Sequence, residues 1–191
     1  MSKRFFACVY GGASERIADS HKEKIEHLGK IIAENGFSLV YGAGAKGCMG
    51  AVARGVKEKN GTVMGISPDF IDSFEERFAC DEKITVDTMA ERKTLMEKYA
   101  DVFFIAPGGI GTMDEFFQVL TLKYLNRIDA PIVVLNLDGF YDSLINLIND
   151  LIRQGAAAEG IHSLYEVVTE ISEDTISSIL KRCVPEDQHT R

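Results

Sequence analysis

The sequence predicts a Rossmann-like α/β fold, with a parallel sheet flanked by helices on both faces, in one domain over residues 1–184. Short apolar runs of strand length alternate with longer segments of helical period. This alternation is typical of parallel sheets, because each parallel connection needs a crossover that is usually a helix. Asn-Gly pairs at 35–36 and 60–61 each separate a helical segment from the next apolar run, where a left-handed cap commonly ends a helix. With 191 residues, 46% of them hydrophobic, the chain can build one sizeable core and has little room for a second domain.

Each element follows from a local pattern. Short continuous apolar runs predict buried strands at 5–10, 37–41, 62–66, 84–86, 101–106, 131–136 and 165–168. Apolar residues at helical spacing predict helices at 20–34, 49–59, 89–99, 113–126, 141–154 and 173–181. The segment 67–81 interrupts this rhythm and predicts a loop with a short helix over the sheet's edge, which could act as a lid. The polar residues 185–191 predict a disordered tail.

The charge and the cysteine content exclude several functional classes. The net charge is −8, so nucleic acid is not an expected partner, and an anionic ligand needs local cations or backbone N–H groups. The 4 cysteines form no C-x-x-C pair and predict reduced thiols in a cytoplasmic protein. We expect no leader peptide and no membrane contact, since no apolar run approaches the length of a membrane span. No histidine stands beside a glycine loop, so we expect neither a metal nor another cofactor.

A first glycine-rich stretch, GAGAKGCMG at 42–50, follows the second expected strand and precedes a helix. Its spacing satisfies G-x-G-x-x-G, but the next strand ends without the acid that a dinucleotide site places about 20 residues further on. A Walker loop is excluded as well, because no Lys-Ser/Thr pair follows the last glycine. Two interpretations stay open. The stretch is either a tight, closely packed turn or a backbone surface that a ligand approaches, and NAD is not favoured.

A second glycine-rich stretch, PGGIGTMDE at 107–115, has a clearer chemical meaning. Its glycines let the backbone turn sharply and point N–H groups outward, and the helix that follows adds its positive end. This is a phosphate site that needs no lysine. An acid in the first turn is favourable against the helix dipole alone, which is sufficient reason for Asp114. Glu115 would repel a bound anion and must serve another part of the ligand, as a base, nucleophile or cation stabiliser.

The adjacent cations Arg92 and Lys93 open the third expected helix, where the dipole disfavours positive charge. They are either a solvated basic pair beside Glu91 and Glu97 or cations that face an anion. With the glycine loops and Glu115, the second interpretation describes a nucleoside monophosphate pocket. Cleaving a glycosidic bond develops oxocarbenium charge on the sugar, and a nearby carboxylate stabilises that charge or takes up the nucleophile. We therefore expect the phosphate on the loop and the acid near the ribose.

Together these motifs resemble the LONELY GUY (LOG) family. The resemblance rests on P-G-G-x-G-T-x-x-E at 107–115, E-R-K at 91–93 and the glycine stretch at 42–50, and it extends from Cys8 to about Val168. The family consists of cytokinin riboside 5′-monophosphate phosphoribohydrolases, once mislabelled as lysine decarboxylases. The resemblance implies a Rossmann-like fold and at least a homodimer, with active sites near the subunit interface. It also implies hydrolysis of N6-substituted AMP to the free base and ribose 5-phosphate.

On this pattern Arg92 and Glu115 are the expected catalytic residues. The expected substrate-binding residues are Lys93, Gly108, Gly109, Ile110, Gly111, Thr112, Thr121, Gly11, Gly12, Ser14, Gly42, Gly44, Gly47 and Met49. The chain differs from plant-like members at Ala90, at Asp114 and at 122–126, differences that bear on base specificity. Two alternatives stay open: a nucleosidase for AMP or another purine nucleotide, and a non-catalytic protein that binds a nucleotide or the molybdenum cofactor.

Overall fold

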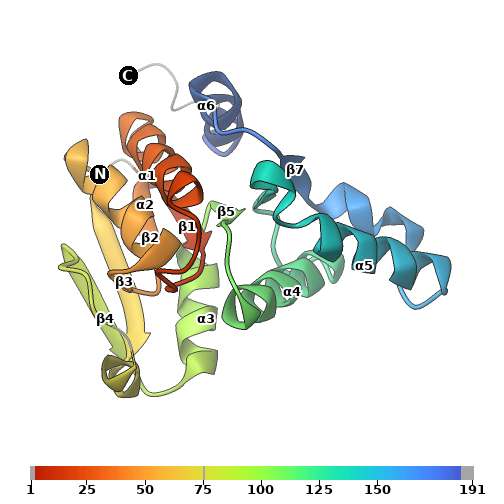
Figure 1. Ribbon diagram of the computed structural model, residues 1–191, viewed down its shortest axis with the longest axis horizontal. Helices are drawn as coiled ribbons and strands as arrows, with labels where there is room; N and C mark the ends of the chain where they lie inside the picture. Colours follow the sequence, from red (N-terminus) through yellow and green to blue (C-terminus); the bar gives the residue numbers. More distant parts are fainter. Residues whose placement is uncertain (1–2, 75, 186–191) are drawn as a thin grey trace.

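A computed structural model describes residues 3–74 and 76–185, and a seven-stranded sheet forms the centre of this part of the chain (Figure 1). Apart from Pro185, the tail expected at 185–191 lies outside the described residues. The strands are β1 (Phe6–Tyr10), β2 (Ser38–Tyr41), β3 (Val63–Pro68), β4 (Glu82–Val86), β5 (Val102–Ile105), β6 (Ile132–Leu135) and β7 (Glu166–Val168). All pairs are parallel, in the order β4-β3-β2-β1-β5-β6-β7. From β1 the chain adds β2, β3 and β4 on one side and then β5, β6 and β7 on the other. In open parallel sheets ligands bind at such a switch point, which here lies between β1 and β5.

Helices cover both faces of the sheet. On one face α1 (Asp19–Glu34) packs against α2 (Gly47–Glu58) and α6 (Glu173–Arg182) (Figure 1). The other face carries α3 (Met89–Tyr99), α4 (Ile110–Tyr124) and α5 (Asp142–Arg153), because right-handed crossovers that run in the opposite direction place their helices on the opposite side. The 3-10 helices η1 (Asp69–Ser73), η2 (Leu137–Gly139) and η3 (Glu159–Leu164) lie in the connections. Within the described ranges no helix is long and apolar enough to cross a membrane.

The Rossmann-like fold expected from the sequence is confirmed, and every expected strand and helix is present. Helices α2 and α4 begin at Gly47 and Ile110, slightly earlier than expected, because a first helical turn needs no periodic apolar residue. Gly36 follows α1 with a φ of 76°, as the first Asn-Gly pair predicts. In the second pair Asn60 has the positive φ, 56°, because asparagine visits the left-handed region more readily than most residues.

The central strands form a core that is buried on both faces. Every residue of β1, β2, β5 and β6 is buried, which explains their continuous apolar runs. The edge strand β4 instead alternates half-buried and exposed residues, since it has a neighbour on one side only. At the centre the ring of Tyr10 stacks on that of Phe103 with 5.9 Å between centroids. This packing holds the loops at the carboxyl ends of β1 and β5 in place.

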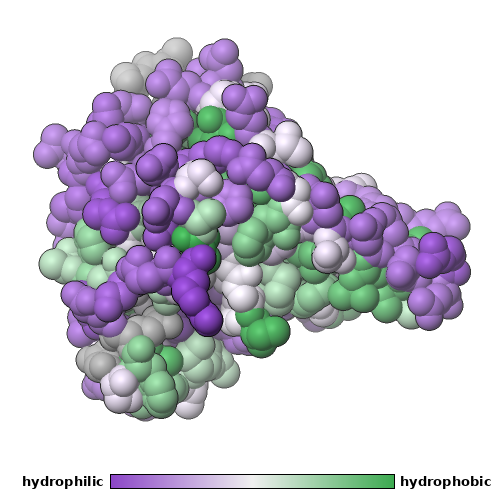
Figure 2. Space-filling model, viewed as in Figure 1, coloured by the Kyte–Doolittle hydropathy of each residue, from purple (hydrophilic) through white to green (hydrophobic). Residues whose placement is uncertain are grey.

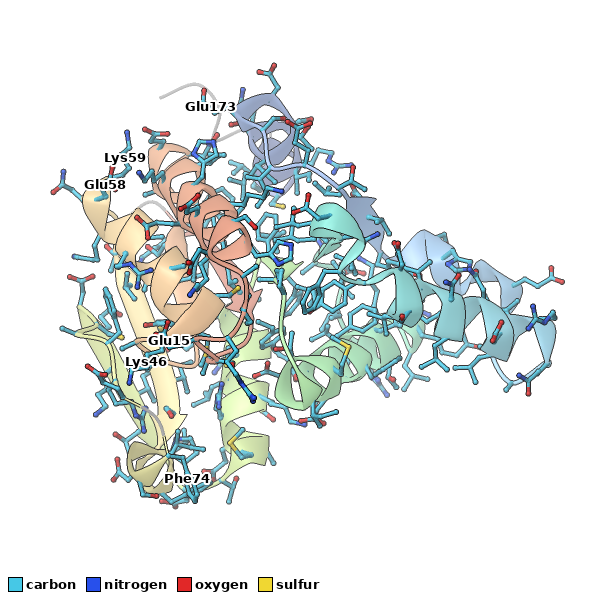
Figure 3. All side chains as sticks on the ribbon, in the orientation of Figure 1. Glu15, Lys46, Glu58, Lys59, Phe74 and Glu173 are labelled. Atoms are coloured by element: carbon cyan, nitrogen blue, oxygen red, sulfur yellow. The ribbon has the colours of Figure 1, made fainter. Side chains whose placement is uncertain are left out.

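The segment after β3 forms the expected short helix, η1, at the edge of the sheet. The segment is tied to the loop after β2, because the Phe78 N–H donates to the Ala43 carbonyl at 2.9 Å. Phe70 and Phe74 are 51% and 80% exposed, and Phe74 lies at the outer end of the molecule (Figure 3). Figure 2 shows hydrophobic surface at the same end. A role as a lid stays a prediction.

Candidate active site

A cavity of about 500 Å³ lies at the carboxyl ends of β1 and β5, at the switch point of the sheet. Its walls come from the loops after these two strands and from the first turns of α3 and α4. The lining includes these residues predicted from the sequence: Gly11, Gly12, Ser14, Met49, Arg92, Gly108, Gly109, Gly111, Thr112 and Glu115. Motifs that are far apart in the chain therefore meet in one cavity.

The remaining predicted residues lie around this cavity without lining it: Lys93, Ile110, Thr121, Gly42, Gly44 and Gly47. Ile110, in the first turn of α4, is 87% exposed. Thr121 lies further along α4 and lines a neighbouring cavity between α3 and α4. Asp114 lines both cavities and forms the boundary between them. Gly44 pairs with Arg77 in an isolated antiparallel bridge.

The loop before α4 presents its backbone to the cavity. Gly109 is the N-cap, and no described side chain caps the helix, so the first N–H groups have no intrahelical acceptor. Gly108 is closely packed, because a Cβ there would lie 2.1 Å from Thr112 Oγ1 and 2.8 Å from the Gly12 nitrogen. At Gly109 and Gly111, by contrast, nothing described lies within 4 Å of an added Cβ. This leaves open space above the positive end of α4, which suits a phosphate.

Arg92 and Glu115 form a charged floor beneath this space. They are 7% and 6% exposed, and Nη2 of Arg92 lies 3.3 Å from Oε1 of Glu115. Breaking a buried ion pair costs several kcal/mol, because the remaining charge has lost its solvation, so each group fixes the other. Nη1 of Arg92 lies 3.7 Å from Sδ of Met89. The buried Nε of Arg92 has no hydrogen-bond partner within the described ranges.

Two side chains of β1 lie behind this floor. Burial raises the pKa of Cys8 and of Tyr10 well above their ordinary values, and the negative charge of Glu115 adds to both shifts. Both groups are therefore neutral at physiological pH and bring no further charge to the floor. Burial also raises the pKa of Glu97 on α3, although its hydrogen bond with Gln118 acts in the opposite direction.

The start of α3 is capped by its own residues. The Glu91 N–H donates to the Thr88 hydroxyl at 3.1 Å, and the Glu91 carboxylate accepts from the Asp87 N–H at 2.9 Å. This exchange is a variant of the capping box, and it sets the direction in which α3 leaves β4.

Arg92 and Lys93 of α3 each face an acid on α4. Lys93 lies 2.8 Å from Asp114, and Arg92 lies against Glu115 as described above. The side chain of Lys93 is only 14% exposed. The interpretation as a solvated basic pair therefore does not describe these residues. The two ion pairs join α3 to α4, one in the floor of the cavity and one beside it.

The structure adds lining residues that the sequence analysis did not select: Ala13, Ile17, Ile71, Met89, Asp114 and Phe140. Met89 stands one helical turn before Arg92, and this spacing could have revealed it. Ile71 belongs to η1 and Phe140 follows η2, so the loops after β3 and β6 close the two ends. No short sequence pattern marks Ile71 or Phe140 as a lining residue, because their positions at the cavity depend on the order of the strands.

The glycine stretch at 42–50 makes room for other parts of the protein. A Cβ on Gly42 would lie 2.0 Å from Nη2 of Arg92, so the missing side chain accommodates the guanidinium. Gly47 has a φ of 57°, and its Cβ would lie 2.4 Å from the Gly12 carbonyl oxygen. That carbonyl accepts a hydrogen bond from the Cys48 N–H at 2.9 Å, so this N–H group at the start of α2 already has an acceptor within the protein. The fold and the cavity thus define a Rossmann-like protein in which the uncapped start of α4 borders a cavity at the switch point of the sheet.

Comparison with known proteins identifies the family. Residues 49–178 match the family model described as "Possible lysine decarboxylase". The chain is 35% identical over 181 residues to the cytokinin riboside 5′-monophosphate phosphoribohydrolase of Mycobacterium tuberculosis, which covers 93% of this chain and 92% of that protein. It is 32% identical over 179 residues to the LOG2 enzyme of Arabidopsis thaliana, with coverage of 93% and 83%. The chain belongs to the LOG family, as its motifs predict.

Further matches extend this picture. The rice LOG enzyme (Oryza sativa subsp. japonica) is 36% identical over 156 residues, and the match spans 63% of that longer protein. A molybdenum cofactor binding protein from Rippkaea orientalis superposes with a TM-score of 0.71 at 18% identity, over 97% of this chain and 100% of that chain. The molybdenum cofactor carrier protein of Chlamydomonas reinhardtii gives 0.71 at 21% identity, over 95% and 98%. At such identities the likeness shows the fold alone.

Proposed function

We propose that this protein hydrolyses the N-glycosidic bond of an N6-substituted AMP, a cytokinin riboside 5′-monophosphate, to the free base and ribose 5-phosphate. The observation that carries the proposal is the buried Arg92–Glu115 pair, 3.3 Å apart, beside an uncapped helix end in one cavity. The names of relatives that match most of this chain state this activity.

The start of α4 supports the placement of the phosphate. No described side chain caps its first N–H groups, and Gly109 and Gly111 leave open space beside them. A phosphate held there by backbone donors and the positive helix end would position the rest of the nucleotide before the reaction. A nucleoside lacks this anchor, so we expect it to be a poor substrate.

The position of Glu115 supports a role at the ribose. Glu115 stands in the second turn of α4, so a phosphate at the helix end would bring the sugar within reach of its carboxylate. As the bond to the base breaks, positive charge develops on the sugar, and the carboxylate stabilises it or takes up the nucleophile. Arg92 orients the carboxylate through their ion pair. A carrier protein would gain nothing from a carboxylate beside an anionic ligand, which favours hydrolysis over storage.

Chromatography of AMP and N6-isopentenyl-AMP incubated with the purified protein tests this function. We expect the wild type to release base and ribose 5-phosphate, and Glu115→Gln to lower the rate by about 100-fold or more. The matched control is Glu166→Gln, because Glu166 and Arg182 form an ion pair, 2.8 Å apart, that does not line the cavity. This control should cleave at the wild-type rate. Nucleotide binding without cleavage by the wild type would favour a sensor or carrier. The ratio of the cleavage rates of AMP and N6-isopentenyl-AMP shows which base the protein prefers.

We further propose that the protein acts as a homodimer in the cytoplasm. Tyr124 and Leu125, at the end of α4, are 53% and 56% exposed, which supports an apolar contact there. Thr121 lies one turn earlier and would reach a nucleotide from the second subunit. The cysteines are all free thiols, which suits a reducing compartment. Light scattering should give twice the chain mass of 21.1 kDa, and a monomer mass would contradict the dimer.

A further inference from the structure

The turn between β6 and α5, residues 136–142, packs against the loop that leads into α4. Tyr141 in this turn is 3% exposed, and its hydroxyl donates to the Ala106 carbonyl at 2.6 Å. Burial raises the pKa of Tyr141, and a hydrogen bond with the backbone of Gly108 acts in the opposite direction. One phenol therefore contacts the chain on both sides of Pro107, immediately before the open glycines.

The turn is closed by its own hydrogen bonds. Asn136 accepts the Tyr141 N–H with Oδ1 at 2.7 Å and donates to Asp142 through Nδ2 at 2.8 Å. Asp138 and Gly139 adopt positive φ angles of 52° and 75°, which reverse the chain within a few residues. These contacts fix the backbone from which the Tyr141 side chain projects.

The turn is also fastened to α1. Nζ of Lys24 lies 2.7 and 2.9 Å from the two carboxylate oxygens of Asp138, and Nε2 of His21 lies 3.2 Å from the same carboxylate. The His21 ring meets Phe140 edge-on, with 5.6 Å between centroids. Phe140 lines the cavity, whereas Tyr141 does not. The turn thus bridges a helix on one side and the glycine loop on the other.

We propose that Tyr141 is a positioning residue for the phosphate end of the cavity. Its hydroxyl fixes Ala106 and Gly108, and through them the backbone N–H groups at the start of α4. The inference rests on the proposed nucleotide function and deepens it, because it names a residue that sets the preference for a monophosphate over a nucleoside. Tyr141 contacts no ligand itself, so its effect passes through the loop.

Calorimetric binding of AMP and of adenosine to Tyr141→Phe tests the inference. The loss of one hydroxyl should weaken AMP binding by about tenfold and leave adenosine binding within about twofold of the wild type, because only the phosphate depends on the loop. The matched control is Tyr165→Phe, a second buried tyrosine, whose hydroxyl lies 3.0 Å from Nδ1 of His162 and outside the cavity lining. The control should change neither affinity. An unchanged ratio of the two affinities in Tyr141→Phe, or an equal loss for both ligands, would overturn the proposal.

This test does not depend on turnover. If the wild type cleaves neither AMP nor N6-isopentenyl-AMP, the proposed function fails. The affinities for AMP and adenosine still decide the role of Tyr141. Should Tyr141→Phe not fold, Asp138→Asn removes the negative charge that pairs with Lys24 and lies beside His21, and it keeps a residue that tolerates a positive φ. We expect this variant to weaken AMP binding by about threefold and to spare adenosine. Unchanged AMP binding would overturn the proposal.

Discussion

The two glycine-rich loops at the carboxyl edge of the sheet are alike in sequence and different in what their glycines face. In the stretch 42–50 the missing side chains accommodate the protein itself, as where Gly42 faces the guanidinium of Arg92. In the stretch 107–112, Gly111 faces open space within the cavity. The first loop therefore supports the floor, and the second is open to a ligand. A glycine motif has to be interpreted by what occupies the space of the missing Cβ.

The largest effect is expected at Gly42, where the first loop meets the Arg92–Glu115 pair that we propose to be catalytic. In Gly42→Ala the new Cβ would lie 2.0 Å from Nη2 of Arg92 and displace the guanidinium. Misplacing a catalytic group by about 1 Å costs roughly 100-fold in rate, so we expect such a loss of kcat/KM with N6-isopentenyl-AMP. Gly160→Ala serves as the control, because nothing described lies within 4 Å of that Cβ. Activity close to wild type in Gly42→Ala would show that Arg92 does not depend on this loop.

Gly47→Ala should mainly destabilise the fold. The residue has a φ of 57°, and its Cβ would lie 2.4 Å from the Gly12 carbonyl oxygen. Strain of this kind costs about 1–3 kcal/mol, which lowers the Tm by roughly 3–10 °C in a chain of this size. Thermal unfolding followed by circular dichroism measures the change. A Tm equal to that of the wild type would mean that the loop relaxes without cost.

Gly111→Ala should, in contrast to Gly47→Ala, leave the stability of the fold unchanged and weaken ligand binding. Its Cβ enters open space, so the fold should keep its Tm or gain slightly, because alanine is the better helix former. The same methyl group would occupy part of the phosphate space and lower the affinity for AMP by about tenfold. Calorimetry and a melting curve on one sample separate the two effects. If the Tm falls while the affinity holds, the contrast between the loops is wrong.

The smallest effect concerns Glu97, a half-buried acid on α3 that lies outside both loops. Because burial raises the pKa of Glu97, its contribution to stability is fully present below pH 4.5, its ordinary pKa, and is lost as the pH rises through the raised value. Glu97→Gln should therefore raise the Tm by about 1–2 °C at pH 7 and have no effect at pH 4. Exposed Glu159→Gln gives the background. An equal rise in Tm at both pH values would show that the raised pKa of Glu97 is not the cause.

The sequence predicted the order and type of the elements because each depends on local periodicity and capping. It also predicted the glycine turn that leads into α4, and a phosphate site in this turn stays a prediction. For the first loop it left two interpretations open, because only the folded structure shows that Arg92 fills the space beside Gly42. Ile71, Phe140 and Tyr141 were missed. Their positions depend on which strands are neighbours, and that is not encoded in any short stretch.

A crystal structure of Glu115→Gln with AMP would show directly which glycine loop holds the phosphate. We expect phosphate oxygens within hydrogen-bond distance of the backbone N–H groups of residues 109–112, with the ribose above position 115. A phosphate bound at the glycine stretch 42–47 would contradict this expectation, because that loop would then be the anion site.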